Sequence, residues 1–492
     1  MAKVIDPAQS AFVPNRWIVE NVVLAQEIVH SFKKGKKKKG LVGFKLDFHK
    51  AYDCLEWDFI ITVLKALGFD QKATNLIYQC ISTVSFTLLL NGGKSASISS
   101  TRGIREGDPP SPYLFILCGE VLARLINREV GGRLISGAKL APGAPSISSL
   151  FYADDVLLFC GAKIEALMHC IDKYCGWSGQ SINRDKSGIF VSKGVHTQFI
   201  RQVKNQWGIK QLPKDVKYLG LPLFLSANKS KDLAFVKDKL EARVCGWKSK
   251  CLSWMGRATL IKTVAQASPI YGMSAFKFPK DLCEDLNAIV RKFWWNPKKE
   301  DNRFYTPMTW SNLCRPLSDG GLGFRPFESF NEAMIAKLAW WVLSNRDNFC
   351  VKVLRAKYKV GSNWLQARPT GAASFSWRGL EGVRYILAKG ACHLVGSGDN
   401  ILVWRDPWIP NPPDYLPQPR DNVEPQCLAV AQLMNHDKLG WDENKLKDLF
   451  NEETVLAIKN IPRWSREQED KWVWLKTTSS EFSVKSAYKE IC

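Results

Sequence analysis

The sequence has little of what structural zinc sites and membrane spans require. Its fourteen cysteines include no Cys-x-x-Cys pair and its six histidines form no closely spaced pair, so no zinc site is expected within the chain. No apolar run approaches the ~20 residues of a membrane-spanning helix, and the N-terminus carries no secretory signal pattern. Cysteines such as Cys80, Cys118 and Cys160 stand singly in apolar runs, which is typical of a reducing compartment. We therefore expect a soluble, intracellular protein without a membrane partner.

Acidic residues are also few relative to basic ones. The chain of 492 residues has 69 Lys and Arg against 47 Asp and Glu, a net charge of +22 and a pI near 9.4. This balance favours a nucleic-acid partner, with a basic protein that binds no nucleic acid as the alternative. Lysines at 33, 34 and 36–39 can contact phosphates or form a nuclear import signal, or they form a solvated loop. The length allows about two to four domains.

Two adjacent carboxylates stand between strand-like apolar runs. Residues 149–159 read Ser-Leu-Phe-Tyr-Ala-Asp-Asp-Val-Leu-Leu-Phe. Runs this apolar predict a buried hairpin that presents Asp154 and Asp155 at its tip. Like charges side by side repel unless a cation lies between them, so the pair suits divalent metal chemistry. A solvated Asp-Asp turn is the alternative.

A further carboxylate ends another predicted strand. Residues 40–48 read Gly-Leu-Val-Gly-Phe-Lys-Leu-Asp-Phe, and the apolar pattern ends at Asp47. Paired in space with the hairpin, Asp47 can hold two Mg²⁺ ions together with Asp154 and Asp155. Two such ions polarise the attacking and leaving oxygens of a phosphoryl transfer. We interpret the neighbouring His49 as a packing or surface residue.

A turn with two glycines leads into a predicted buried helix. Residues 103–112 read Gly-Ile-Arg-Glu-Gly-Asp-Pro-Pro-Ser-Pro and precede a long apolar run. Ser111 as the N-cap and Pro112 at the first helical position predict where the helix begins. The glycines allow the backbone to approach a nucleotide or a template strand closely, and an ordinary irregular turn is the alternative.

Together these segments resemble the palm motifs of a reverse transcriptase. More narrowly, the chain is similar to the polymerase of plant non-LTR retrotransposons of the long interspersed element type. The motifs occur in the family's order and at family-like spacing. The segments that carry the resemblance are residues 9–16, 44–53, 105–112, 151–155, 178–183 with 186–187, and 217–222.

The resemblance implies an α+β fold. We expect a right-hand polymerase palm, made of an antiparallel sheet with packed helices, followed by a helical thumb and a mostly helical C-terminal extension. It implies that Asp47, Asp154 and Asp155 are the catalytic residues and the ligands of two Mg²⁺ ions. It also implies a primer-grip turn, which in this chain is made of Tyr218, Leu219 and Gly220.

The resemblance further implies a set of nucleotide-binding residues. The carbonyl of Phe48 adds a metal ligand, and the ring of Tyr52 blocks a 2′-hydroxyl and so selects deoxynucleotides. Tyr52 can also be a core aromatic at the start of a helix, and both roles can hold at once. Arg105 and Gly107 belong to the segment that cradles template and nucleotide. Lys186 lies near the incoming triphosphate, or it is a solvated lysine in a turn.

The chain departs from the family pattern at two positions in that cradle. The family carries Gln where this chain has Glu106, and Leu where it has Pro110. A carboxylate ~5 Å from a triphosphate charge costs up to ~3 kcal/mol at an effective dielectric of ~20, and Pro110 removes an amide donor. We also expect a polymerase truncated at both ends, without the upstream fingers and endonuclease and with only the threshold of a zinc-binding domain. These features suggest a decaying copy.

Further elements and four domains are predicted along the chain. In residues 232–266 basic and apolar positions alternate, which fits a thumb that follows a sugar-phosphate backbone, or an amphipathic bundle with a charged exterior. Residues 401–404 are predicted as a short strand, and the proline-rich residues 407–419 as a linker. The predicted domains are 1–192 (palm with partial fingers), 193–300 (primer grip and helical thumb), 301–395 (helical extension) and 396–492 (a small α+β segment leading into a truncated zinc-binding region).

Two functions stay open on the sequence. The first is an RNA-directed DNA polymerase whose partners are an RNA template, a DNA primer and deoxynucleoside triphosphates, acting in the nucleus. The second is a catalytically inactive relic that binds nucleic acid non-specifically through its basic surface. The acidic residues and Tyr52 favour the first function, whereas Glu106, Pro110 and the truncation favour the second. The sequence predicts no oligomeric state.

Overall fold

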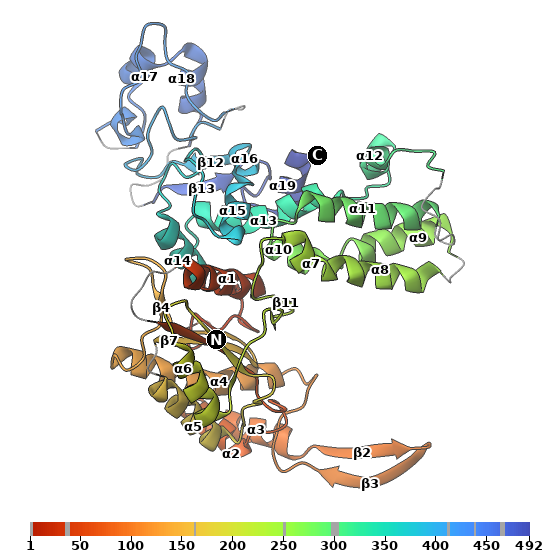
Figure 1. The fold of residues 1–492 in the computed structure, drawn as a ribbon. Coiled ribbons are helices and arrows are strands. Elements are labelled where there is room, and N and C mark those ends of the chain that lie inside the picture. The colour runs from red at the N-terminus through yellow and green to blue at the C-terminus, as the bar shows by residue number, and fades with distance from the viewer. Residues whose placement is uncertain are drawn as a thin grey trace. The chain divides into compact units, whose positions relative to one another are not determined.

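The computed structural model describes residues 3–34, 40–161, 164–248, 252–296, 305–410, 414–436, 439–462 and 468–492. Contacts divide the chain into two units (Figure 1). Unit 1 comprises residues 1–224 and 348–357, and unit 2 comprises residues 225–347 and 358–492. The predicted basic loop at 36–39 lies outside the described residues, as do residues 411–413 of the predicted linker.

A five-stranded sheet forms the centre of unit 1, with the strand order β6-β7-β1-β8-β9. Every neighbouring pair is antiparallel except β8 and β9, which are parallel. Val42, Phe44 and Leu46 alternate along β1 and are fully buried, as the period of two in a strand requires. The strands are β1 (Leu41–Leu46), β6 (Ser149–Tyr152), β7 (Asp155–Gly161), β8 (Gly188–Val191) and β9 (Lys210–Gln211). The predicted strand before Asp47 and the predicted hairpin around Asp154 are confirmed.

The helices between residues 57 and 207 contribute buried side chains to one apolar core that they share with this sheet. The longest helix, α4, buries most of its apolar residues, as predicted. The helices are α1 (Ile18–Lys34), α2 (Trp57–Ala66), α3 (Gln71–Ser82), α4 (Ser111–Gly131), α5 (Glu165–Ser178), α6 (Thr197–Trp207) and α14 (Phe349–Tyr358, of which residues up to Lys357 belong to unit 1). In α14, Lys357 pairs with the buried Glu27 of α1.

The start of α4 corrects one detail of the sequence prediction. Pro110, not Ser111, is the N-cap, and its carbonyl accepts hydrogen bonds from the amides of Tyr113 and Leu114. The Ser111 hydroxyl is buried and makes no hydrogen bond with any described residue. Because the first amides of a helix have no partner inside it, proline is tolerated at this position. Pro110 therefore fits the fold rather than disrupting it.

Three two-stranded ladders complete unit 1. The β2–β3 hairpin extends away from the other elements of its unit (Figure 1), and its strands are exposed on both faces. The other two ladders consist of very short strands. The strands are β2 (Ser85–Leu90), β3 (Gly93–Ser99), β4 (Ala138–Lys139), β5 (Ser146–Ile147), β10 (Lys217–Tyr218) and β11 (Leu221–Pro222).

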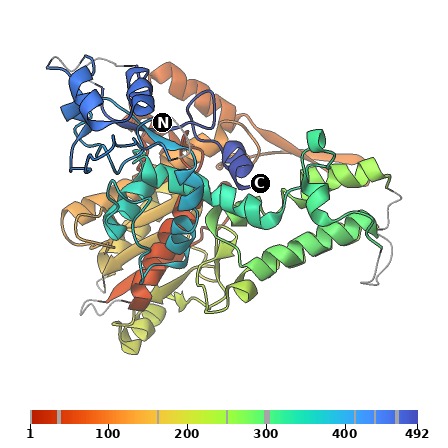
Figure 2. The ribbon, with the colours of Figure 1, turned by 90° about the horizontal axis from the view of Figure 1, so that it is seen from above.

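Unit 2 is mostly helical. α8 and α11 lie side by side in both ribbon views (Figures 1 and 2). A separate apolar core is formed by residues between Val395 and Ile461. None of the described helices combines the length and the apolar composition needed to cross a bilayer. The α-helices and strands are α7 (Lys229–Leu233), α8 (Phe235–Lys248), α9 (Trp254–Leu260), α10 (Ile270–Ala275), α11 (Lys280–Trp295), α12 (Trp310–Cys314), α13 (Phe327–Leu343), α15 (Phe375–Glu381), α16 (Arg384–Ala388), α17 (Glu443–Leu449), α18 (Glu452–Lys459), α19 (Val484–Ile491), β12 (Ala391–Leu394) and β13 (Lys471–Trp474). A π-helical turn (Ile261–Ala265) and two 3₁₀ turns (Leu317–Asp319 and Val430–Leu433) complete it.

The two units differ from the four predicted segments. The predicted boundary at 192 falls inside unit 1, because β9 pairs with β8 and Val203 and Ile209 belong to the core of that unit. The predicted boundary at 395 separates β12 from its partner β13. Residues 401–404 form no strand and contribute only an isolated bridge between Leu402 and Ala429.

Candidate active site

The antiparallel register brings the end of β1 to the tip of the β6–β7 hairpin. Leu46, the last residue of β1, pairs with Val156, and Tyr152 pairs with Asp155 across the turn. Asp47 follows Leu46 directly, so it lies beside the turn that carries Asp154 and Asp155. The sheet therefore brings together acidic residues that are more than a hundred positions apart in the sequence.

The acidic residues interact electrostatically. The pKa of Asp154 is raised, first by burial of its carboxyl among protein atoms and then by the negative charges of Asp155 and Asp47. The ammonium of Lys45 acts in the opposite direction and lowers that pKa. A cation beside Asp154 would oppose both causes, because it stabilises the charged form of the carboxyl.

Lys45 supplies a positive charge inside this group. Its Nζ lies 2.9 Å from Oδ1 of Asp155, and the two side chains are 12% and 33% exposed. Sequence reasoning assigned Lys45 no role. The signal was available, since residues two apart on a strand share a face and Lys45 stands two before Asp47.

The metal-binding roles of Asp47, Asp154 and Asp155 stay predictions. Among the residues that the structure describes, no three His, Cys, Asp or Glu side chains are grouped so that they can hold a metal ion. Asp155 pairs with Lys45, and this positive charge offsets part of the repulsion between neighbouring carboxylates. The carboxylate oxygens of Asp47, Asp154 and Asp155 are donors of the kind that a hard cation such as Mg²⁺ prefers.

A turn from residues 183 to 187 fixes the backbone of Asp47. The amide of Asp47 donates to Oγ of Ser187 (3.0 Å), and its carbonyl accepts from the amide of Asn183 (2.8 Å). Lys186 lies in this same turn and is exposed. Its placement near a triphosphate stays a prediction, as does the alternative of a solvated lysine.

The two residues after Asp47 differ in their exposure to solvent. Phe48 is buried and bridges to Ile182, and its ring contacts that of Tyr174 edge to face. The role of its carbonyl as a metal ligand stays a prediction. His49 is exposed, in agreement with its interpretation as a surface residue.

Tyr52 lies against both the core and the acidic group. Its ring stacks on Phe115, with centroids 4.7 Å apart and planes 5° apart. Its pKa is raised, first by burial and then by the charges of Asp154 and Glu106. Tyr52 is therefore a core aromatic whose hydroxyl lies near the candidate site, which is compatible with both predicted roles.

The two glycines of the turn before α4 serve different purposes. A Cβ on Gly103, whose φ is +88°, would lie 2.6 Å from the carbonyl oxygen of Asp53, so this glycine permits close packing inside the chain. Gly107 also has a positive φ, but it faces open space. Arg105 is exposed, and its Nη2 lies 3.6 Å from Oδ2 of Asp108.

Gly103, Arg105 and Asp108 line part of a cavity of about 600 Å³ at the base of the β2–β3 hairpin. Its wall includes Phe86 from the hairpin as well as Arg102, Arg105 and Glu106 from the turn. The binding roles of Arg105 and Gly107 stay predictions.

The predicted primer-grip turn connects β10 and β11 in unit 1. Tyr218 and Leu219 are buried, and the Tyr218 hydroxyl accepts a hydrogen bond from Nδ2 of Asn21 (3.5 Å). Gly220 is exposed at the tip. Only the tip of this turn is therefore open to a partner, and its contact with a primer stays a prediction.

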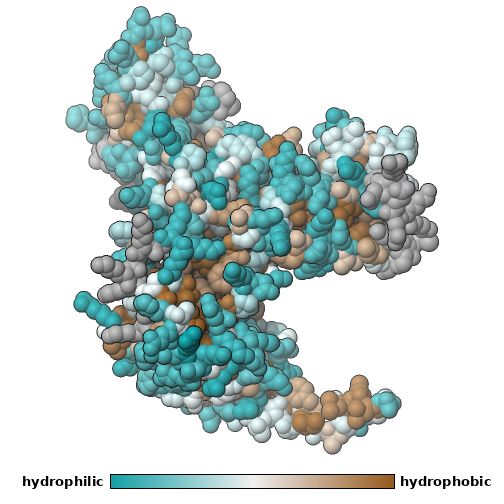
Figure 3. All heavy atoms as spheres, viewed as in Figure 1, coloured by the Kyte–Doolittle hydropathy of each residue, from teal (hydrophilic) through white to brown (hydrophobic). Residues whose placement is uncertain are grey.

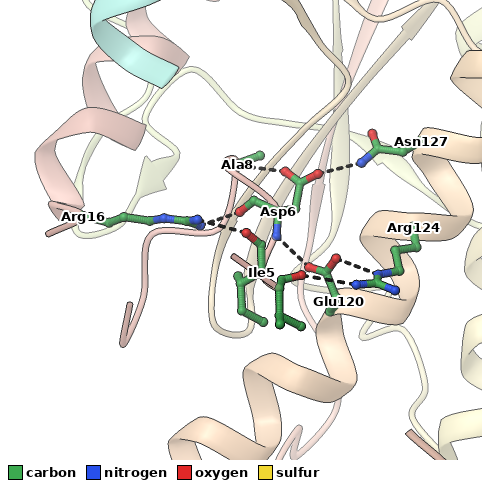
Figure 4. A network of polar contacts seen from close by, with 8 residues as sticks. Ile5, Asp6, Ala8, Arg16, Glu120, Arg124 and Asn127 are labelled. Atoms are coloured by element: carbon green, nitrogen blue, oxygen red, sulfur yellow. Dashed lines mark hydrogen bonds and ion pairs between the residues drawn. The ribbon is translucent and has the colours of Figure 1, made fainter. Parts of the chain in front are cut away.

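The N-terminal segment is tied to α4 by a polar network (Figure 4). Glu120 accepts from the amide of Asp6 (2.8 Å) and from Nε of Arg124 (2.9 Å), and Asn127 donates to the Asp6 carboxylate (2.6 Å). Arg16 donates to the carbonyls of Ile5, Asp6 and Gln9. Contacts at Asp6 and Arg16 thus hold the segment on both sides of residues 8–10, which pair with β6.

Comparisons with known proteins agree with this geometry. Residues 1–223 match the family described as "Reverse transcriptase (RNA-dependent DNA polymerase)". A ribonuclease H protein of Arabidopsis thaliana, so named, is 31% identical over 52% of this chain and 42% of its own length. An uncharacterised mitochondrial protein of the same plant is 33% identical over 29% of this chain and 93% of its own length. A Pol polyprotein of the R2 retrotransposable element of Popillia japonica is 27% identical over 39% of this chain and 27% of its own length. The chain thus spans less than half of two of these three relatives.

Proposed function

This chain belongs to the reverse transcriptase family through its residues 1–223, and we propose that it acts as an RNA-directed DNA polymerase. Its partners would be an RNA template, a DNA primer and deoxynucleoside triphosphates. The Arabidopsis and R2 relatives support an origin in a plant non-LTR retrotransposon. The single observation that carries the proposal is the strand register, which brings Asp47 at the end of β1 beside the β6–β7 turn that carries Asp154.

In this proposal each residue of the site has a separate role. Asp47 and Asp154 would hold Mg²⁺, which when bound polarises the oxygens of a phosphoryl transfer. Lys45 neutralises Asp155 and limits the repulsion at the hairpin tip. The ring of Tyr52, fixed by its stack on Phe115, would exclude a nucleotide that carries a 2′-hydroxyl. The primer 3′-hydroxyl then displaces pyrophosphate from the α-phosphate of the bound nucleotide.

A primer-extension assay on an RNA template with Mg²⁺ tests the proposal. The native chain should extend the primer with deoxynucleotides, and Asp154→Asn should lower the rate by roughly 10³-fold, as loss of several kcal/mol of charge stabilisation requires. Asp58→Asn is the matched control, because Asp58 is an exposed acid on α2. An equal rate for Asp154→Asn and native protein would refute the proposed role of Asp154.

One observation favours the second candidate function, an inactive protein that binds nucleic acid. Glu106 lines the same cavity as Arg105, and its charge helps to raise the pKa of Tyr52, so it would add negative charge where a triphosphate would lie. If the native chain makes no product but retains RNA in a filter-binding assay, Glu106→Gln should restore extension when this charge is the defect. No product from Glu106→Gln would leave binding as the function.

A further inference from the structure

The turn of the β6–β7 hairpin has an unfavourable backbone conformation. Two residues, Ala153 and Asp154, connect Tyr152 to its partner Asp155. Ala153 has a φ of +53°, a region that L-residues other than glycine, asparagine and aspartate rarely occupy. Two-residue hairpin turns with a positive φ at the first position usually hold glycine or asparagine there. Something outside the turn must therefore hold it in this conformation.

A buried glutamine from the N-terminal segment contacts that residue. Gln9 is 4% exposed, and its Oε1 accepts hydrogen bonds from the amides of Ala153 (3.3 Å) and Ala11 (2.9 Å). Gln9 thereby joins the N-terminal segment to the hairpin turn, next to Asp154.

The backbone around Gln9 also pairs with the outer edge of β6. The amide of Phe151 donates to the carbonyl of Ala8 (2.9 Å), and the amide of Ser10 donates to the carbonyl of Phe151 (3.0 Å). Nδ2 of Asn21 donates to the same Phe151 carbonyl (2.8 Å). The hairpin is thus held by β1 on one side and by residues 8–10 on the other.

We propose that Gln9 is a positioning residue, whose side-chain oxygen holds the Ala153 amide so that Asp154 stays beside Asp47. An uncharged acceptor suits this place, because a carboxylate there would add a further negative charge next to Asp154. The kinetic part of this inference rests on the proposed polymerase function, whereas the structural part does not.

The structural test is hydrogen exchange of the Ala153 amide in the full chain. In Gln9→Leu the exchange should accelerate by about tenfold, since a lost hydrogen bond worth ~1.4 kcal/mol lowers the local opening free energy by that amount. Ser10→Ala is the matched control, because the Ser10 hydroxyl is buried and makes no hydrogen bond with any described residue. Unchanged exchange at Ala153 in Gln9→Leu would overturn the proposal.

The kinetic test separates positioning from general support. Gln9→Leu should lower kcat by about tenfold and change the KM for a deoxynucleotide by less than about twofold, because Gln9 aligns Asp154 and contacts no nucleotide. Placed in an Ala153→Gly background, the same change should lower kcat by less than about threefold, since glycine adopts a positive φ without help. An equal loss in both backgrounds would mean that Gln9 only supports the N-terminal segment, and the proposal would fail.

The outcome of the structural test does not depend on the outcome of the kinetic test. If the native chain makes no product, the polymerase function fails while hydrogen exchange still decides the contact. If Gln9→Leu does not fold, the double variant with Ala153→Gly decides, since it should fold and show native exchange in the hairpin strands. A double variant that also fails to fold would overturn the proposal, because relief of the turn should compensate for the lost contact.

Discussion

Two of the hairpins in unit 1, β2–β3 and β6–β7, have the same plan and opposite character. Both connect their strands through two residues, Asn91-Gly92 in β2–β3 and Ala153-Asp154 in β6–β7. Asn91 and Gly92 both have positive φ values, +50° and +83°, which is the signature of a type I′ turn. The strands of β2–β3 are exposed, whereas those of β6–β7 are buried.

The contrast shows two ways to specify a hairpin. The β2–β3 sequence has the turn residues that its geometry needs, so it encodes the hairpin locally. The β6–β7 turn has alanine where glycine would be favoured, so its conformation depends on β1 and on the N-terminal segment. Strain that the surrounding structure must maintain is typical of functional sites, and the candidate catalytic residue Asp154 lies on the strained turn.

Hydrophobic residues gather on the exposed hairpin in the space-filling view (Figure 3). Its large side chains are solvent-exposed even though they are hydrophobic. They are Phe86, Leu88, Leu89, Leu90 and Ile98. These residues add little to the stability of the fold, because side chains that remain in water gain no burial energy.

The largest expected difference between the hairpins is in packing energy. Leu158 on β7 is fully buried in the core of unit 1, whereas Leu89 on β2 is 70% exposed. We expect Leu158→Ala to lower the free energy of unfolding by about 2–5 kcal/mol, and Leu89→Ala to change it by less than about 0.5 kcal/mol. Urea denaturation followed by tryptophan fluorescence measures both.

The pair of leucine variants is its own control, since the chemical change is the same. Equal destabilisation by the two variants would contradict the comparison, because it would mean that β2–β3 is packed against another surface in solution. A gel-filtration measurement of both variants would then show whether that surface belongs to a second copy.

The β12–β13 ladder of unit 2 makes the stability of the protein depend on pH. Burial lowers the pKa of His393 to about 4, against the opposing charges of Asp406 and Asp470. The ring lies on Trp472, with centroids 3.7 Å apart, and neither ring nitrogen bonds to a described residue. The folded protein therefore holds this histidine neutral at a pH where the unfolded chain binds a proton.

The sign of the effect follows from that difference. Stability contributed by the neutral ring is present above pH 6.5, the ordinary pKa, and is lost as the pH falls towards about 4. The loss reaches roughly 3 kcal/mol at most. Urea midpoints of unit 2 measured between pH 7 and 4 should fall in the native protein and fall less in His393→Phe, which keeps an aromatic ring on Trp472. Parallel curves for the two proteins would contradict the assignment.

The sequence predicted the elements of the candidate site well. The strand before Asp47, the hairpin around Asp154 and the helix after Ser111 all follow from strong local signals, namely apolar alternation, an acidic turn and a proline-marked helix start. Their spatial pairing followed from the resemblance to a known family, because period and propensity cannot say which strands are neighbours.

The sequence did not predict contacts between residues that lie far apart in the chain. Lys45 pairs with Asp155 across two strands, and Gln9 reaches a turn 144 residues away. Neither contact has a local pattern. The predicted boundaries at 192 and 395 failed for a related reason, since β9 and β13 pair with strands on the far side of each boundary.

The smallest expected effect tests the turn of the exposed hairpin. Gly92 has a φ of +83° and open space around its Cβ position, so Gly92→Ala creates strain without a clash. We expect a local loss of about 1 kcal/mol, seen as faster hydrogen exchange of the Leu90 amide with little change in global stability. The neighbouring Gly93 is the matched control, because its φ is not positive and an added Cβ would lie an ordinary 3.4 Å from the carbonyl of Leu90. Ala153→Gly in the other hairpin should change stability in the opposite direction. If Gly92→Ala instead unfolded unit 1 as a whole, β2–β3 would not be locally encoded, and the distinction between the two hairpins would be lost.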